Sequence, residues 1–189
     1  MPRINPLEPP YSETLQELFD LVMPEGMDPL VLFRVLAKNE RLLSRFMRGG
    51  ILDKGPIPIR DREIVIHRTT ALCGAEYEWG VHVSGFGRPL GLGDETLLAT
   101  VDGDESNPAF SDRQAALVAL CDSLHQTSRI SDELWERLTL HYDELQIQEL
   151  IYTVGFYHMV SFLCNGMGLE NESFGATFSE IRTSTLANA

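Results

Sequence analysis

Apolar residues recur at intervals of three and four along most of the chain, and apolar and polar residues almost nowhere alternate. Spacing of three and four places side chains on one face of an α-helix, whereas alternation is typical of a strand. The pattern therefore predicts an all-α protein. The expected helices span residues 12–23, 28–48, 60–72, 76–86, 94–102, 111–124, 131–138 and 144–165.

Helix-starting residues support several of these boundaries. Ser131 precedes an apolar helical pattern, and Ser111 with Gln114 forms a capping box, in which each side chain bonds to the backbone of the other residue. Asp28 followed by Pro29 combines a cap residue with a proline at the first helical position, so we expect a helix to begin there.

The last expected helix, 144–165, is apolar around most of its circumference. Such a helix is buried on several faces, either at the centre of a bundle or between subunits. The segment 175–189 is rich in Ser, Thr and Ala, and we expect an arm that becomes ordered only on a partner. No repeat or long linker divides the chain, so we expect one helical domain at 29–174, preceded by an extension with the first helix at 1–28.

Composition narrows the classes of function. The 189 residues include 15 Lys and Arg against 28 Asp and Glu, and the resulting charge of −13 argues against nucleic acids and anionic membranes as partners. Three cysteines exclude a disulfide-stapled scaffold and fit a reducing compartment. No apolar run reaches the roughly 20 residues of a membrane span, and the start MPRINPLEPPY lacks the apolar core of a secretion signal. We therefore expect a soluble cytoplasmic protein.

One window, RDREIVIHRTTALCGAEYEWGVH at 60–82, concentrates ionisable residues among apolar ones. Glu78 and His82 are four residues apart, which places them on the same helix face, and Glu63 and His67 repeat this spacing one helix earlier. A carboxylate beside an imidazole orients the ring and favours its protonated form, as a general acid or base requires. The alternative is a solvated surface pair that contributes little to stability.

Two features favour the functional interpretation of Glu78 and His82. The bulky residues Tyr77 and Trp79 interleave with them, so the polar pair has apolar flanks. Residues 58–90 carry four arginines and four carboxylates, so the net charge of −13 lies outside this window. A locally neutral, arginine-bearing region in an acidic protein is suited to a small anionic substrate.

The sequence gives weaker support to a metal site or a nucleotide-binding site. Neither HExxH nor CxxC occurs and the five histidines are scattered, so no metal or cofactor is expected, although Glu78, His82 and His158 form an alternative ligand set. The glycine pairs at 85–87 and 91–93 lack the third glycine and the preceding strand of a dinucleotide fingerprint.

The three cysteines have different settings. Cys121 and Cys164 lie in apolar helix patterns and fit simple packing. Cys73 lies just before the helix of Glu78 and His82, where a helix N-terminus would lower the pKa of a thiol. Packing is the favoured interpretation there too, but Cys73 is the one candidate for a reactive thiol.

The run REIVIHRTTALCGAEYEWGVH, followed by GLGDETLLA and later by LIYTVGFYHMVSFLCNGMG, resembles the carboxymuconolactone decarboxylase superfamily, which includes alkyl hydroperoxidase D. The resemblance covers roughly residues 40–170, including the spacing between the blocks. It implies an all-α, AhpD-like helical bundle that assembles into homo-oligomers, trimers or hexamers, through long apolar helices.

The resemblance also implies site residues. The Glu-x-x-x-His of the family falls on Glu78 and His82, its Arg-Glu block falls on Arg62 and Glu63, and its later tyrosine falls on Tyr157.

The chain departs from the peroxidase members of the family at one important point. They carry a Cys-x-x-Cys whose second cysteine lies four residues before the histidine, and here those positions are Ala75 and Glu78. Cys73 lies two residues too early to replace the first of them. Without two neighbouring thiols there is no attacking and resolving pair, whereas decarboxylase members do place a Glu here.

Three hypotheses follow. The first is a decarboxylase-like lyase acting on a small carboxylated lactone or carbonyl acid, in which a protonated His82 held by Glu78 supplies a proton and an arginine binds a carboxylate. The second is a thiol-dependent peroxidase that uses Cys73. The third is an oligomeric binding protein without catalysis. The residues expected in the lyase site are Glu63, Glu78 and His82 for catalysis, and Arg62, Arg68, Trp79 and Tyr157 for substrate binding.

Overall fold

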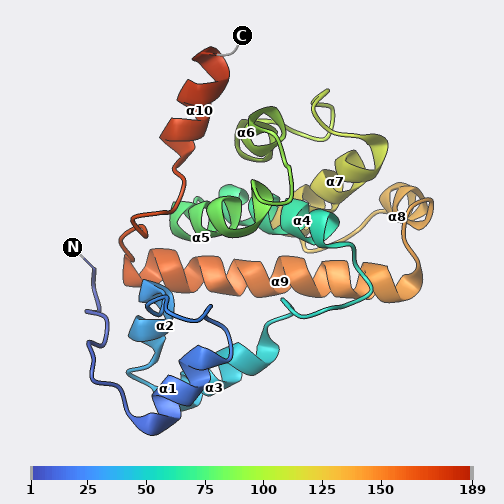
Figure 1. The fold of residues 1–189 in the computed structure, drawn as a ribbon. Helices are drawn as coiled ribbons and strands as arrows, with labels where there is room; N and C mark the ends of the chain where they lie inside the picture. The colour runs from blue at the N-terminus through green and yellow to red at the C-terminus, as the bar shows by residue number, and fades with distance from the viewer. Residues whose placement is uncertain (1, 188–189) are drawn as a thin grey trace.

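The computed structural model describes residues 2–187, and these form an all-helical bundle without a strand, as the apolar pattern predicts (Figure 1). The α-helices are α1 (Glu13–Asp20), α2 (Val31–Leu36), α3 (Glu40–Gly49), α4 (Ile59–Leu72), α5 (Glu76–His82), α6 (Asp94–Asp102), α7 (Asp112–Thr127), α8 (Asp132–Thr139), α9 (Glu144–Met167) and α10 (Phe178–Ala187). A π-helix, η1 (Val83–Gly87), continues α5.

Local caps set most of these boundaries. The capping box of Ser111 and Gln114 is confirmed at the start of α7, and the Ser131 side chain accepts from the backbone N–H of Leu134 at the start of α8. The expected helix at 76–86 is also present, but its last turn is widened into η1. A single π turn of this kind often accompanies a functional site.

The helix expected over 28–48 is wrong in two respects. It begins at Val31, because the side chains of Glu172 and Tyr77 accept the free N–H groups of Val31 and Leu32, at 2.6 and 3.0 Å. It also ends at Leu36, and a second helix, α3, starts where the Asn39 side chain accepts from the N–H of Leu42. Both departures depend on acceptors that helical periodicity does not reveal.

Helix α4, not the last long helix, is the most deeply buried element. Every residue from 61 to 70 is buried, including five charged or titratable ones. Figure 1 shows α9 running between the N-terminal helices α1–α3 and the α4–α5 pair, with α6 and α7 on the far side of α4. Because α4 packs against α5, α6, α7 and α9, its polar side chains are held in the interior.

Helix α9 is buried where it packs against α4 and α5, but part of its surface is exposed. Ile147, Leu150 and Val154 are in the core, whereas Tyr152 and Phe162 are 48% and 68% exposed. An interface between subunits on this face stays a prediction. None of the described helices is long and apolar enough to cross a membrane.

The expectation that 175–189 becomes ordered only on a partner is wrong for the described part of this segment. Helix α10 packs on α6, where Ile181 is fully buried, and the Phe178 ring lies 5.0 Å from that of Trp79. The approach is close because Gly80 has no side chain, and a Cβ there would lie 2.1 Å from the carbonyl oxygen of Ala176. Residues 188–189 lie outside the described residues.

Candidate active site

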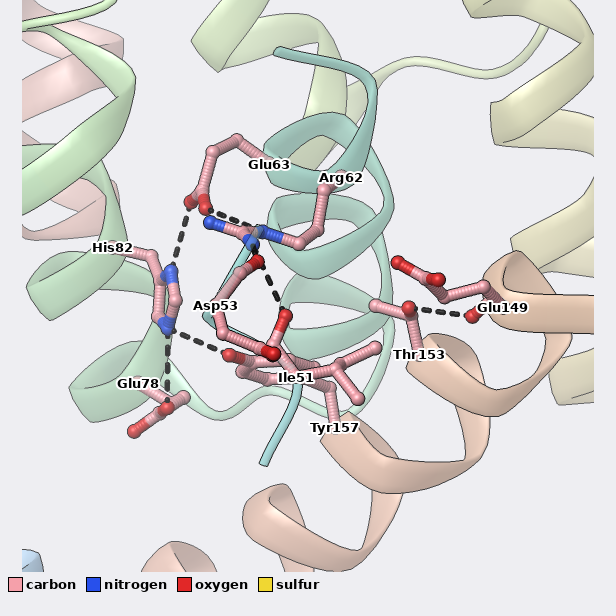
Figure 2. Close-up of polar contacts among 9 residues, drawn as sticks. All are labelled: Ile51, Asp53, Arg62, Glu63, Glu78, His82, Glu149, Thr153 and Tyr157. Carbon is pink, nitrogen blue, oxygen red and sulfur yellow. Dashed lines mark hydrogen bonds and ion pairs between the residues drawn. The ribbon is translucent and has the colours of Figure 1, made fainter. Parts of the chain in front are cut away.

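Three helices bring five polar side chains together in the interior (Figure 2). Helix α4 provides Arg62 and Glu63, α5 provides Glu78 and His82, and α9 provides Tyr157. All five are at most 6% exposed. We refer to them as the His82 cluster.

Both nitrogens of the His82 ring are engaged. Nδ1 lies 2.8 Å from Oε2 of Glu63, and Nε2 lies 3.1 Å from the Tyr157 hydroxyl and 3.5 Å from Oε1 of Glu78 (Figure 2). The Phe86 ring, from η1, stacks on the imidazole at 5.1 Å. The ring is therefore fixed in orientation, with one carboxylate on each side.

This surrounding sets the charge of His82. Burial alone would lower the pKa of the imidazole, but the negative charge and hydrogen bond of Glu63, with those of Glu78, outweigh burial and raise that pKa to about 9. Burial would raise the pKa of Glu63, but the charge and hydrogen bond of His82, with the charge of Arg62, lower it overall. At neutral pH the centre of the cluster is thus an imidazolium held by an ionised carboxylate.

Several polar atoms of the cluster have no hydrogen-bond partner among the described residues. They are Nε of Arg62, Oε1 of Glu63 and Oε2 of Glu78. Arg62 Nε and Glu63 Oε1 are 3.6 Å apart, which is an ion pair but too long for a hydrogen bond. Buried polar groups without partners are uncommon, and they point to a site that water or a small polar ligand completes.

The backbone at Ile51 and Asp53 passes beside the cluster (Figure 2). Nη1 of Arg62 donates to the carbonyl oxygens of both residues, at 3.0 and 3.2 Å. Glu149, on α9, lies close enough that the charge of Arg62 opposes the rise in its pKa caused by burial. Arg62 therefore connects the cluster to the connector between α3 and α4.

The cluster is closed in this conformation. Two cavities of about 430 and 380 Å³ lie at the N-terminal helices, and neither is lined by a residue of the His82 cluster. Trp79 and Tyr157 are the aromatic residues that the sequence predicts for substrate binding beside His82. Tyr157 does contact His82, but Trp79 points into the core, where its Nε1 donates to Thr100.

His67 does not form the expected pair with Glu63, because the Glu63 carboxylate bonds to His82 instead. His67 is fully buried, and neither of its ring nitrogens finds a hydrogen-bond partner among the described residues. Burial lowers its pKa to about 4, with the Glu63 charge opposing and the His82 charge adding to this effect. His67 is thus neutral at pH 7, so of these two histidines only His82 carries a positive charge.

Arg68 lies away from the cluster. Its Nε and Nη2 bond to the two carboxylate oxygens of Asp122 on α7, at 2.6 and 2.9 Å, and its Nη1 donates to the carbonyl of Thr100. These contacts hold α4 to α6 and α7, so the geometry gives no support to substrate binding by Arg68.

We expect Asp122→Asn to lower the free energy of unfolding by about 2 kcal/mol, because the Arg68 guanidinium then stays buried without a counter-charge. Urea unfolding at pH 7 measures this loss. Asp102→Asn is the matched control, since Asp102 makes the same two-bonded pair with Arg182 but both side chains are almost half exposed. We expect a loss there of at most about 0.5 kcal/mol. Equal losses in the two variants would contradict the importance of burial.

Cys73, like Arg68, does not belong to the His82 cluster. Its Sγ lies near ligand atoms of His125 and His158, and burial raises the pKa of the thiol, with a hydrogen bond to Ser161 opposing the rise. The lowered pKa expected at a helix N-terminus is therefore wrong. The five histidines are scattered along the sequence, but His125 and His158 meet in the fold, where Nδ1 of His125 lies 2.9 Å from Nε2 of His158. Both histidines lie where α7 contacts α9. They are 33 residues apart, and a separation of that length does not predict that two residues meet.

Comparisons with known proteins show the fold. No protein-family model matches the chain, and no curated protein matches it by sequence. Solved structures do match. An uncharacterized peroxidase-related protein from Silicibacter sp. TM1040 has 15% identity and a TM-score of 0.76, over 92% of this chain and 93% of its own. A protein from Ralstonia eutropha JMP134 described as an alkylhydroperoxidase AhpD core has 14% identity and a TM-score of 0.77, over 90% and 93%.

The debrominase Bmp8 has 15% identity and a TM-score of 0.76, over 94% of this chain and 97% of its own, and has also been solved with 2,3,4-tribromopyrrole. The chain therefore has the AhpD-like fold, and the resemblance seen in the sequence is confirmed at this level. Enzymes occur on this fold, but identities this low carry no reaction from one protein to another.

Proposed function

We propose that the chain is an acid–base enzyme that decarboxylates a small carboxylated lactone or a related carbonyl acid, with His82 as its proton donor. The observation that carries this proposal is the His82 ring held between Glu63 on Nδ1 and Tyr157 with Glu78 on Nε2, buried and protonated at neutral pH.

A buried imidazolium suits the reaction. When the carbon–carbon bond to the carboxylate breaks, CO2 leaves and the electron pair moves into the conjugated carbonyl group of the substrate. The Nε2 proton of His82 then passes to the resulting enolate, and Glu63 stabilises the ring through the transfer. The ring regains its proton from solvent when the product leaves.

The other members of the cluster have distinct roles in this proposal. The Tyr157 hydroxyl keeps Nε2 directed at one point, and the unpartnered oxygen of Glu78 accepts a hydroxyl or a protonated group of the substrate. Arg62 binds the substrate carboxylate in place of the carbonyls of Ile51 and Asp53. The connector between α3 and α4 must therefore move aside for the substrate to enter.

The size of the substrate has independent support. The debrominase that shares this fold was solved with a small ring compound, 2,3,4-tribromopyrrole. By analogy with that protein, we propose that the substrate here is also a small ring compound that carries a carboxylate.

Peroxidase chemistry is disfavoured by the same geometry. Ala75 and Glu78 occupy the positions of the two peroxidase cysteines, and the Cys73 thiol has a raised pKa that leaves it protonated at neutral pH. A thiol that stays protonated is a poor attacking group. If the protein turned over no substrate, the third hypothesis, a binding protein without catalysis, would be favoured.

The test is CO2 release from a panel of carboxylated lactones and β-keto acids. We expect His82→Gln to lower kcat/KM by at least about 100-fold, because the glutamine keeps a hydrogen bond to Glu63 but carries no transferable proton. His141→Gln, which changes a histidine outside the cluster, is the control and should keep full activity. No release above the spontaneous rate by the wild type, or equal release by wild type and His82→Gln, would contradict the proposal.

A further inference from the structure

A second cluster of potential ligand atoms lies outside the His82 cluster. Cys73 is the C-terminal cap of α4, His125 is in the last turn of α7, and His158 is in the middle of α9. One ligand atom from each lies within 4.8 Å of those from the other two. These three helices pack against one another, and their packing holds the three residues close together.

The tautomer of His158 is fixed in the form that a metal requires. Its Nδ1 lies 2.8 Å from the carbonyl oxygen of Val154, and because a carbonyl only accepts, Nδ1 carries the hydrogen. Nε2 therefore presents a lone pair, 2.9 Å from Nδ1 of His125. Metal-binding histidines are commonly oriented in this way, with the second nitrogen donating to a backbone carbonyl.

His125 and Cys73 complete the donor set. In the described structure Nδ1 of His125 donates to Nε2 of His158, but His125 is exposed, so its hydrogen can move to Nε2 and release the Nδ1 lone pair. Cys73 is half-buried and adds a sulfur. Asp122 lies nearby but is bound to Arg68, and we do not count it as a ligand.

We propose that Cys73, His125 and His158 form a Zn²⁺ site. Two imidazole nitrogens and one thiolate are donors that zinc favours, whereas Mg²⁺ and Ca²⁺ require oxygen donors. In a tetrahedral shell, with the usual zinc–nitrogen and zinc–sulfur bond lengths, neighbouring donors lie about 3.3–3.6 Å apart. The three donors already lie within 4.8 Å of one another, so small side-chain rotations would bring them to that spacing, and water would fill the fourth position.

Binding changes the protonation of the site. Burial keeps the Cys73 thiol protonated at neutral pH, so zinc displaces one proton to form the thiolate. The bound ion then links the ends of α4 and α7 to the middle of α9. None of the three ligands belongs to the His82 cluster, so the site does not depend on the proposed acid–base function.

The test is titration of the metal-free full chain with Zn²⁺ in a calorimeter, combined with Co²⁺ absorption, in which a sulfur-to-cobalt charge-transfer band reports a thiolate ligand. We expect one ion per chain. Each of Cys73→Ser, His125→Gln and His158→Gln should weaken binding by at least about tenfold, since even losing a supporting hydrogen bond commonly has that effect. Cys73→Ser should also abolish the charge-transfer band.

His141→Gln and Cys164→Ala serve as controls, since each removes a residue of the same type outside the cluster and should leave binding unchanged. Far-UV circular dichroism checks the fold of every variant, and a rise in the Tm of the wild type with Zn²⁺ gives a measurement that needs no variant. The proposal is overturned if the wild type binds no stoichiometric zinc, or if Cys73→Ser keeps full affinity.

Discussion

Glu63→Gln is expected to lower the free energy of unfolding by about 3 kcal/mol at pH 6, and by progressively less as the pH rises toward 9. In the wild type the folded pKa of His82 is about 9, above the ordinary value of 6.5. The protonated ring therefore adds stability that is fully present below pH 6.5 and is lost as the pH rises through 9. Glutamine keeps the size of the side chain and a hydrogen-bond acceptor but removes the larger of the two charges that raise this pKa, and burial, which lowers it, remains.

Urea unfolding of both proteins at pH 6, 7.5 and 9 measures the effect, and NMR titration of the histidine ring gives the pKa directly. Glu136→Gln is the matched control, because Glu136 is exposed on α8 and loses the same charge. We expect no pH-dependent difference between that variant and the wild type. A gap between Glu63→Gln and the wild type that stayed constant from pH 6 to 9 would mean that His82 is not charged in the folded state.

Gly80→Ala is expected to detach the C-terminal segment while the rest of the bundle stays folded. A Cβ at position 80 would lie 2.1 Å from the backbone oxygen of Ala176, and backbone atoms cannot rotate out of the way. Detaching the segment exposes Ile181 and separates Phe178 from Trp79. Burial of side chains of this size suggests a loss of about 3 kcal/mol.

Limited proteolysis and hydrogen exchange of residues 175–187 measure this detachment. Gly155→Ala is the control, since a Cβ at that position in α9 meets nothing within 4 Å, and alanine favours helix by about 1 kcal/mol over glycine. That variant should be as stable as the wild type or slightly more so. Unchanged protection of the segment in Gly80→Ala would show that the backbone can shift to make room.

The sequence predicts most of the helices because local features decide them. Ser111 with Gln114 and Ser131 are caps that act within three residues, and apolar periodicity marks the helices that follow. The start of α2 was not predictable in this way, because Glu172 and Tyr77 decide it from distant parts of the chain.

The candidate site shows the same division. The spacing of Glu78 and His82 correctly indicated that they share a helix face, but the shorter bond of His82 goes to Glu63, 19 residues away on another helix. The same spacing rule suggested a Glu63–His67 pair that does not form. Family resemblance, not periodicity, placed Tyr157 beside these residues.

The deep burial of α4 could not be predicted from the sequence either. The sequence shows ionisable residues among apolar ones in this helix, and it predicts burial on several faces only for the last helix, 144–165. In the structure Asp61, Arg62 and Arg68 are buried through specific partners, including Arg113 for Asp61 and Asp122 for Arg68. Composition along one helix cannot reveal partners on others.

The hydrogen bonds that start α2 have a consequence for how the chain is made. The Glu172 carboxylate that receives the N–H of Val31 is separated from it by 141 residues. A ribosome releases the N-terminal helices well before this carboxylate. The first turn of α2 is therefore satisfied only after residue 172 has emerged, and we expect the N-terminal helices to dock late, although they are synthesised early.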